Sequence, residues 1–375
     1  MAPHAQWLKE ARMRALFLVP RPGIRGPIPR IAATLVAALR PLGCEVTAEF
    51  WGRRSDCESP LQRVMGRVLD IAKVRRTLAQ GRYDVMVIHT AHDPPAMARD
   101  LPLLVATRRQ SPPVVLHLHG SQADALVSPG HRLIKAASAR LLRLADGALV
   151  LSTEEQRQWQ HFAPWANIRT VRNPYVGAGD APPALDRAAF GIPCGVPLLL
   201  FVGRLVAAKG IFDLLAALPM VLARTGCHLL VAGSGEQAAL AHQAVARSGL
   251  GPHVTLAGYL QGEPLRSAYR LADIFVLPSY HAEGFPTVLA EAMEAGLPIV
   301  TTRLRGAADH LREGENALFV PPRDPTALGE ALLRLLGDVS LRARMGAANR
   351  AAVSQFSPDV VAREYLEALR QIVQR

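Results

Sequence analysis

Short apolar runs alternate with helix-like segments along the whole chain. In the helix-like segments, apolar residues recur every three or four positions, and the intervening runs are rich in Val, Ile, Leu and Phe. In the first half, the expected strands are residues 15–19, 44–50, 84–88, 114–119 and 148–151, and the clearest expected helices are residues 29–40 and 61–79. Such alternation predicts a parallel sheet wrapped by helices.

The second half repeats the pattern. Its expected strands are residues 198–202, 228–232, 254–257, 274–277, 298–301 and 317–320, and a helix is expected over 211–221. Between the halves, Val176-Gly-Ala-Gly-Asp-Ala-Pro-Pro183 has the composition of a linker. With 375 residues, half of them apolar, the chain is long enough for two domains. We therefore expect Rossmann-like, doubly wound α/β domains over 1–175 and 176–357, and a last helix from Pro358 to about Gln374.

Two glutamates carry the strongest indication of function. Glu283 and Glu291 stand eight positions apart after the expected strand 274–277, the first in a loop and the second inside a helix. The N-terminus of a helix attracts phosphate. Carboxylates accept hydrogen bonds from sugar hydroxyls. The pair therefore predicts a sugar nucleotide as ligand.

Two cations follow the expected strand 198–202. Gly203 permits a tight turn, and Arg204 and Lys209 come before the next helix. Ligands of open α/β sheets bind at the carboxyl ends of the strands, where these residues are expected. A guanidinium fork and an ammonium group together suit a diphosphate.

These motifs, in this order, resemble the retaining glycosyltransferases of family 4, which have the GT-B fold of two Rossmann-like domains facing a central cleft. The resemblance is best over residues 198–340. It implies that Arg204 and Lys209 hold the donor diphosphate, that Glu283 contacts the donor sugar and that Glu291 contacts the ribose. It also implies an acceptor-binding N-terminal domain, a nucleotide-sugar-binding C-terminal domain, and a last helix (358–375) that packs back on the N-terminal domain.

One position departs from many family members. Pro286 stands where they have a glycine whose amide faces the donor, and proline has no N–H. We expect the amides of Phe285, Thr287 and Val288 to serve instead.

Further donor contacts are expected in other strand-to-helix loops. His119 ends the strand 114–119, where the resemblance places a His-Gly near the donor sugar, and its imidazole can hydrogen-bond a hydroxyl. The loop Pro22-Gly-Ile-Arg-Gly26-Pro27 is a weaker indication of a donor contact. Its prolines stiffen it, and a purely structural turn is an open alternative. Ser234 and Gly235 are expected to pass under the nucleotide, with Tyr259 near the base.

Gly233-Ser-Gly235-Glu-Gln-Ala238 also fits the dinucleotide pattern G-x-G-x-x-A, which favours a rival class, NAD-dependent oxidoreductases. The rival requires an acidic residue about 20 positions later. Ala257-Gly258-Tyr259 stands there instead.

No metal and no bound cofactor are predicted. His89, His92 and Asp93 have ligand-like spacing, but no strong third ligand follows nearby, and His117 is expected to be structural. The chain has no Asp-x-Asp motif for a metal-bound diphosphate. Its four cysteines form no C-x-x-C pair and are expected to be free, buried thiols.

The predicted reaction moves a sugar from a UDP- or GDP-linked donor to a hydroxyl acceptor, with retention at the anomeric carbon. Glu283 either orients the sugar during front-face attack or acts as a nucleophile, as in retaining glycosidases. A nonhydrolysing sugar-nucleotide epimerase, a binding protein with a degenerate site and a basic nucleic-acid-binding protein are the alternatives. Against the last of them, the sequence shows no nucleic-acid-binding module and few aromatic residues for base stacking.

The positive charge lies in the first half. Residues 1–175 contain 25 Lys/Arg and 13 Asp/Glu, whereas residues 176–375 contain 18 of each. Arg and Lys alternate with leucines in residues 131–144, and a second cluster comprises Arg63, Arg67, Lys73, Arg75 and Arg76. Both clusters suit anionic lipid headgroups, and an Arg-rich surface from biased composition is the alternative.

No apolar run approaches the roughly 18 residues that span a bilayer, and the N-terminus does not resemble a signal peptide. We expect a cytoplasmic protein, peripheral on the inner face of the membrane, whose acceptor is a lipid-linked oligosaccharide or a growing bacterial surface polysaccharide.

Overall fold

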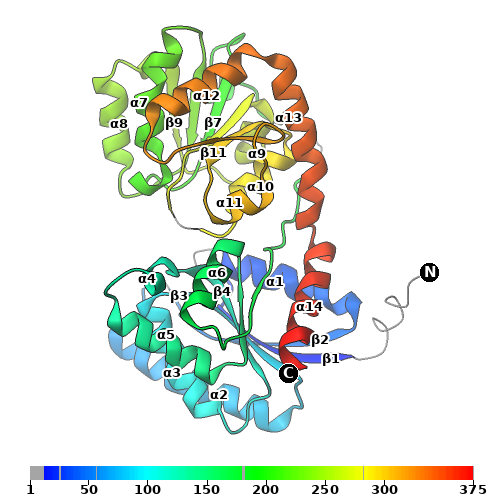
Figure 1. Cartoon of the computed structure of the whole chain (residues 1–375). Coiled ribbons are helices and arrows are strands. Elements are labelled where there is room, and N and C mark those ends of the chain that lie inside the picture. Colours follow the sequence, from blue (N-terminus) through cyan, green and yellow to red (C-terminus); the bar gives the residue numbers. More distant parts are fainter. Residues whose placement is uncertain (1–11, 25–26, 56, 180–181, 282, 375) are drawn as a thin grey trace, which may run out of the picture. The chain divides into compact units, whose positions relative to one another are not determined.

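The computed structural model describes residues 12–24, 27–55, 57–179, 182–281 and 283–374. The chain forms two compact units (Figure 1). Unit 1 comprises Met1–Val176 and Phe356–Arg375, and unit 2 comprises Gly177–Gln355. The division falls next to the expected ends at 175 and 357. Each unit contains a six-stranded sheet whose strand pairs are all parallel. The predicted α/β architecture is confirmed.

The sheet of unit 1 has the order β2-β1-β3-β4-β5-β6. Its strands are β1 (Met13–Val19), β2 (Cys44–Phe50), β3 (Val85–His92), β4 (Val114–Ser121), β5 (Gly147–Val150) and β6 (Ile168–Thr170). Its helices are α1 (Ile28–Leu39), α2 (Pro60–Gln80), α3 (Pro94–Thr107), α4 (Asp124–Val127), α5 (Arg132–Leu144), α6 (Thr153–Phe162) and α14 (Pro358–Val373). Strand β6 was not predicted, because its three residues give no periodic pattern.

Two apolar layers enclose this sheet. Side chains alternate between the faces of a strand, so Phe17 of β1 packs with α1 and α14, whereas Leu16 and Leu18 pack with α2, α3 and α5. Burial on both faces explains why β1 is almost continuously apolar and why β3 begins with four apolar residues, Val85 to Ile88.

Helix α14 belongs to unit 1 although it ends the chain. Arg172 Nε donates to Glu364 at 3.0 Å, and the fully buried Tyr365 places its hydroxyl 3.1 Å from His117 Nδ1. Apolar residues of α14, including Val361, Leu369 and Ile372, complete the same core layer as β1.

The sheet of unit 2 has the order β12-β11-β10-β7-β8-β9. Its strands are β7 (Leu198–Val202), β8 (His228–Ala232), β9 (Val254–Gly258), β10 (Ile274–Leu277), β11 (Ile299–Thr302) and β12 (Ala317–Val320). Its helices are α7 (Ile211–Leu222), α8 (Ala238–Arg247), α9 (Glu263–Leu271), α10 (Thr287–Glu294), α11 (Arg305–His310), α12 (Pro325–Gly337) and α13 (Val339–Ala352). The strand order reverses beside β7, since β8 and β9 lie on one side of it and β10 to β12 on the other.

Among the described residues, none of the helices combines the length and the apolar character that a bilayer-spanning helix requires.

Candidate active site

The residues of the predicted donor site lie where the strand order of unit 2 reverses. Strands β7 and β10 are parallel neighbours, with Ile274 opposite Leu199, so the loops that follow them leave the same edge of the sheet. The first loop carries Gly203, Arg204 and Lys209, and the second carries Glu283. Ligands of doubly wound sheets bind at such a reversal, outside the carboxyl ends of the strands.

Lys209 and Glu283 meet directly. Lys209 Nζ lies 2.6 Å from Glu283 Oε2, and the exposed fractions of the two side chains are 7% and 28%. A buried ammonium group requires such a partner, because desolvation of an unpaired charge is costly. The ion pair thus holds together two residues that are 74 positions apart in the sequence.

The backbones of these two loops approach so closely that a glycine is required directly after Lys209. Gly210 has φ +76°, and a Cβ there would lie 2.2 Å from the carbonyl oxygen of Pro278. Only glycine tolerates both the left-handed conformation and the close approach. The amides of Tyr280 and His281 donate to the carbonyl of Ala208, at 2.9 and 3.0 Å. Lys209 is therefore positioned by the backbone as well as by its ion pair.

Two residues missed in the sequence lie at the same edge. His281 Nε2 is 3.7 Å from Glu283 Oε1. Burial lowers the pKa of His281, with further lowering by Lys209, Arg204 and Arg305, and Glu283 opposes these effects. The imidazole is thus neutral at neutral pH.

Arg305 is 1% exposed and has φ 42°. It begins α11, where Gly306 packs so closely that a Cβ would lie 2.6 Å from the carbonyl oxygen of Gly284. A sequence signal for Arg305 was present. Arg305 stands beside a glycine after a strand, as Arg204 and Lys209 also do.

Glu291 takes a different partner from Glu283. It is the fifth residue of α10, and its Oε2 accepts a hydrogen bond of 2.7 Å from the hydroxyl of Tyr269 on α9. Helix α10 begins at Thr287, immediately after Pro286. The amides of the first turn of a helix, here including Thr287 and Val288, have no partner within the helix and are oriented to bind an acceptor. The ring of Phe285 packs edge-on against His310, with a centroid distance of 5.2 Å.

The glycines of Gly233-Ser234-Gly235 have a packing role. A Cβ on Gly233 would lie 1.9 Å from the carbonyl oxygen of Gly203, and one on Gly235 would lie 2.5 Å from that of Leu205. The amide of Leu205 also donates to the carbonyl of Ser234 at 3.0 Å. Packing against the loop of Arg204 thus accounts for the G-x-G pattern without a dinucleotide.

Ser234, Gly235 and Tyr259 are nevertheless available to solvent. Ser234 and Gly235 are exposed after β8, and Tyr259, which follows β9, is 70% exposed. The end of β9 carries no acidic residue, as the sequence indicated.

His119 lies in unit 1, near the carboxyl end of β4. Its Nε2 is 2.9 Å from His89 Nδ1, its Nδ1 is buried, and burial lowers its pKa to about 3. With Nδ1 buried and Nε2 hydrogen-bonded to His89, a sugar hydroxyl can reach an imidazole nitrogen only if it replaces His89 or the ring turns. Gly26, the other predicted contact in this half, lies outside the described residues.

The histidines are grouped differently from their spacing in sequence. His89 joins His117 and His119, with one possible ligand atom of each within 4.8 Å of the others. His92 instead lies 2.7 Å from Ser138, and Asp93 caps α3 through the amide of Ala96. The spacing of His89, His92 and Asp93 therefore does not bring these three together.

The expectation of four buried thiols is wrong in part. Cys44 and Cys227 are buried, and burial raises the pKa of each to about 11. Cys57 and Cys194 are exposed and lie in loops, outside the helices and strands.

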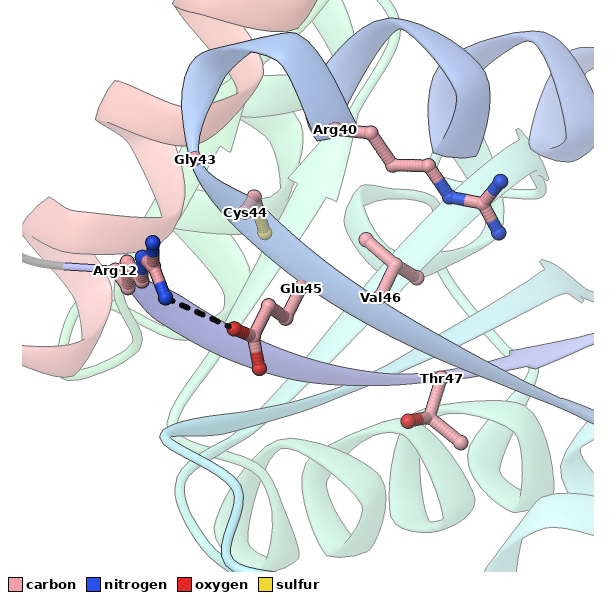
Figure 2. Close-up of a pocket in the computed structure, with 7 residues that line it drawn as sticks. All are labelled: Arg12, Arg40, Gly43, Cys44, Glu45, Val46 and Thr47. Carbon is pink, nitrogen blue, oxygen red and sulfur yellow. Dashed lines mark ion pairs between the residues drawn. The ribbon is translucent and has the colours of Figure 1, made fainter.

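A cavity of about 520 Å³ lies elsewhere in unit 1. Figure 2 shows Arg12, Arg40 and Glu45 around it, at the amino ends of β1 and β2, with Arg12 and Glu45 3.9 Å apart. It therefore opens at the edge of the sheet opposite to the one that His119 approaches.

Both halves of the chain match models of known families. Residues 196–338 match the model described as Glycosyl transferases group 1, and residues 28–175 match Glycosyltransferase Family 4. The chain is 30% identical over 305 residues to a phosphatidyl-myo-inositol mannosyltransferase of Mycobacterium leprae, an alignment that covers 80% of this chain and 77% of that protein. It is 31% identical over 179 residues to an uncharacterized glycosyltransferase of Methanocaldococcus jannaschii, over 48% of this chain and 46% of that protein.

Among solved structures, HepE of Anabaena in complex with UDP and glucose has a TM-score of 0.72 to this chain at 18% identity, over 96% of this chain and 100% of that one. Two parallel-sheet units and these matches define a glycosyltransferase with the GT-B fold, as predicted. The chain belongs to glycosyltransferase family 4.

Proposed function

We propose that the protein transfers a sugar from a UDP- or GDP-linked donor to a hydroxyl of a lipid-linked or growing polysaccharide acceptor, with retention at the anomeric carbon. The observation that carries the proposal is the 2.6 Å contact between Lys209 and Glu283 at the reversal point of the unit 2 sheet. This contact supports the proposal because an ammonium group, which can bind phosphate, lies beside a carboxylate, which can accept hydrogen bonds from sugar hydroxyls.

In this proposal unit 2 binds the donor. Arg204, Lys209 and the first amides of α10 stabilise the negative charge that develops on the leaving diphosphate, and such preorganised stabilisation commonly contributes more to catalysis than any other effect. Glu291 binds the ribose, held in place by its hydrogen bond from Tyr269. These groups need no metal for the task.

Glu283 is proposed to orient the donor sugar. Because its Oε2 is occupied by Lys209, its Oε1 is the oxygen left to accept from a hydroxyl. Front-face attack follows, in which the departing phosphate oxygen takes the acceptor's proton. The carbon–oxygen bond to the diphosphate breaks and the new glycosidic bond forms on the same face of the sugar.

Unit 1 is proposed to bind the acceptor, with His119 supplying a hydrogen bond to the donor sugar after its imidazole turns. The relative from Mycobacterium leprae is named for a phospholipid, phosphatidyl-myo-inositol, and HepE was solved with UDP and glucose. The first name supports a lipid acceptor, and the second supports a nucleotide-sugar donor. The basic half of the chain supports attachment to an anionic membrane surface on the cytoplasmic side.

A panel of UDP-, GDP- and ADP-sugars, with and without membrane extract, tests the proposal. Free nucleotide should appear only when an acceptor is present, and NMR of the product should show the anomeric configuration of the donor. Addition of EDTA should leave the rate unchanged. Interconversion of the donor sugar without an acceptor would instead identify an epimerase, and an inverted product would reject the front-face scheme.

A further inference from the structure

An apolar stripe on α2 faces solvent. Helix α2 exposes Leu61, Val64, Met65, Val68 and Leu69, each between 57 and 69%. Positions three and four apart lie on the same side of a helix, so these side chains form one continuous stripe over the first three turns. Single exposed apolar residues are normal on a protein surface, but a contiguous stripe indicates an interaction site.

The opposite side of α2 is fixed to unit 1. Gly66, Asp70, Val74 and Leu78 are buried and follow one another at intervals of four. Asp70 is 3% exposed and lies 2.7 Å from Arg54, with Arg67 at 3.5 Å. The inward side is thus held by apolar packing and ion pairs, and the apolar stripe is surplus to the fold.

The charges around the stripe favour an anionic occupant. Arg75 and Arg76 continue the same outward side two turns further on, seven positions after Val68 and Leu69, and both are exposed. Asp70 is the single carboxylate within Pro60–Gln80, and it faces inward. A helix with apolar and cationic residues on its outer side, and no exposed acid, matches a membrane interface that contains anionic lipid.

We propose that α2 inserts its apolar stripe (Leu61, Val64, Met65, Val68 and Leu69) into the acyl boundary of an anionic bilayer, while Arg75 and Arg76 contact the headgroups. The inference rests on the proposed lipid-linked acceptor and adds the element that binds the membrane. It differs from charge-driven docking through α5, whose exposed side carries Arg132, Arg140 and Arg143 with Leu133 as its one strongly exposed large apolar residue.

Vesicle sedimentation tests the inference, with vesicles of phosphatidylcholine alone and of phosphatidylcholine with 30% phosphatidylglycerol, in low and high salt. The triple variant Val64→Ser/Met65→Ser/Val68→Ser should weaken binding to the anionic vesicles at least tenfold at both salt concentrations. Arg75→Gln/Arg76→Gln should weaken it in low salt, where charge attraction is least screened. The matched control Leu240→Ser/Val339→Ser, at exposed apolar positions of unit 2, should bind like the wild type.

Two further measurements keep the result interpretable. Circular dichroism should show the triple variant folded, since the three side chains are exposed. Transfer to a water-soluble acceptor should stay at the wild-type rate, so that loss of vesicle binding is separated from loss of the proposed catalysis. Wild-type vesicle binding by the triple variant would overturn the inference. So would a change in its oligomeric state by sedimentation equilibrium, because the stripe would then be a contact between two copies of the chain.

Discussion

The ion pair between Lys209 and Glu283 should be measurable as a coupling energy. We consider Glu283→Gln, Lys209→Met and the double variant. Glu283→Gln keeps the shape of the side chain but removes the charge that partners a 7% exposed lysine. A hydrogen bond to a charged group contributes about 1.5–3 kcal/mol, and breaking a fully buried ion pair costs about 3–5 kcal/mol.

Because Glu283 is partly exposed, the expected loss of stability lies in the lower range, about 1.5–3 kcal/mol. Its side chain is 28% exposed, so water partly replaces the lost interaction. We expect each single variant to destabilise unit 2 by about 2 kcal/mol and the double variant to lose about 1–2 kcal/mol less than the sum of the two. For a unit of the size of Gly177–Gln355, about 2 kcal/mol corresponds to a fall in Tm of about 4–8 °C.

Differential scanning calorimetry measures the stability, because all four tryptophans lie in the first half of the chain and do not report on unit 2. Initial rates should show Glu283→Gln reduced at least about 100-fold, since misplacing a reacting group is that costly. Its affinity for the nucleoside diphosphate should stay within about threefold, because Lys209 and Arg204 are retained. Stability losses that add within about 0.5 kcal/mol would show that the two groups do not interact in solution, and a near-normal rate would remove Glu283 from the mechanism.

Three other outcomes are expected. Arg204→Ala should weaken nucleoside diphosphate binding, measured by calorimetric titration, and transfer, measured by initial rates, about tenfold or more. The control Arg224→Ala, at an exposed position just after α7, should change neither. Equal effects of the two substitutions would reject the role of Arg204. Gly233→Ala should destabilise unit 2 by about 2–4 kcal/mol, because the new Cβ would clash with the carbonyl of Gly203. Gly226→Ala, with open space around the position, is the control. An unchanged unfolding temperature of Gly233→Ala in calorimetry would contradict the packing explanation. Burial lowers the pKa of His92 to about 4 and that of His119 to about 3, so between these values and the unfolded value near 6.5 the unfolded chain binds more protons. The free energy of unfolding of unit 1 should therefore fall by up to about 1.4 kcal/mol per pH unit for each of the two histidines as the pH falls below 6.5. The fluorescence of the buried Trp51 and Trp159 measures this unfolding. A stability that does not change between pH 7 and 5 would count against the burial of the two histidines.

The sequence by itself determined the α/β class and most of the strands. Strands 44–50, 198–202, 228–232, 274–277 and 317–320 were predicted with the bounds that the structure has. For 198–202, 274–277 and 317–320 the reason is that both faces of these parallel strands are buried, so that their residues are apolar without interruption. It also marked the strand-to-helix loops that are proposed to bind the donor, because glycine, cations and carboxylates interrupt the apolar pattern there.

The tertiary structure alone decided which of those groups meet. Spacing along the chain grouped His89 with His92, but their side chains lie in different surroundings, and strand pairing brings His89 to His117 and His119 instead. Glu283 and Glu291 read as one pair in the sequence, yet one is bound by Lys209 and the other by Tyr269. Arg305 follows a strand and precedes a glycine, but its burial beside the loop of Glu283 was visible only in the structure. Local patterns report the burial and conformation of single segments, whereas contacts between distant residues depend on strand order and on how closely two backbones approach.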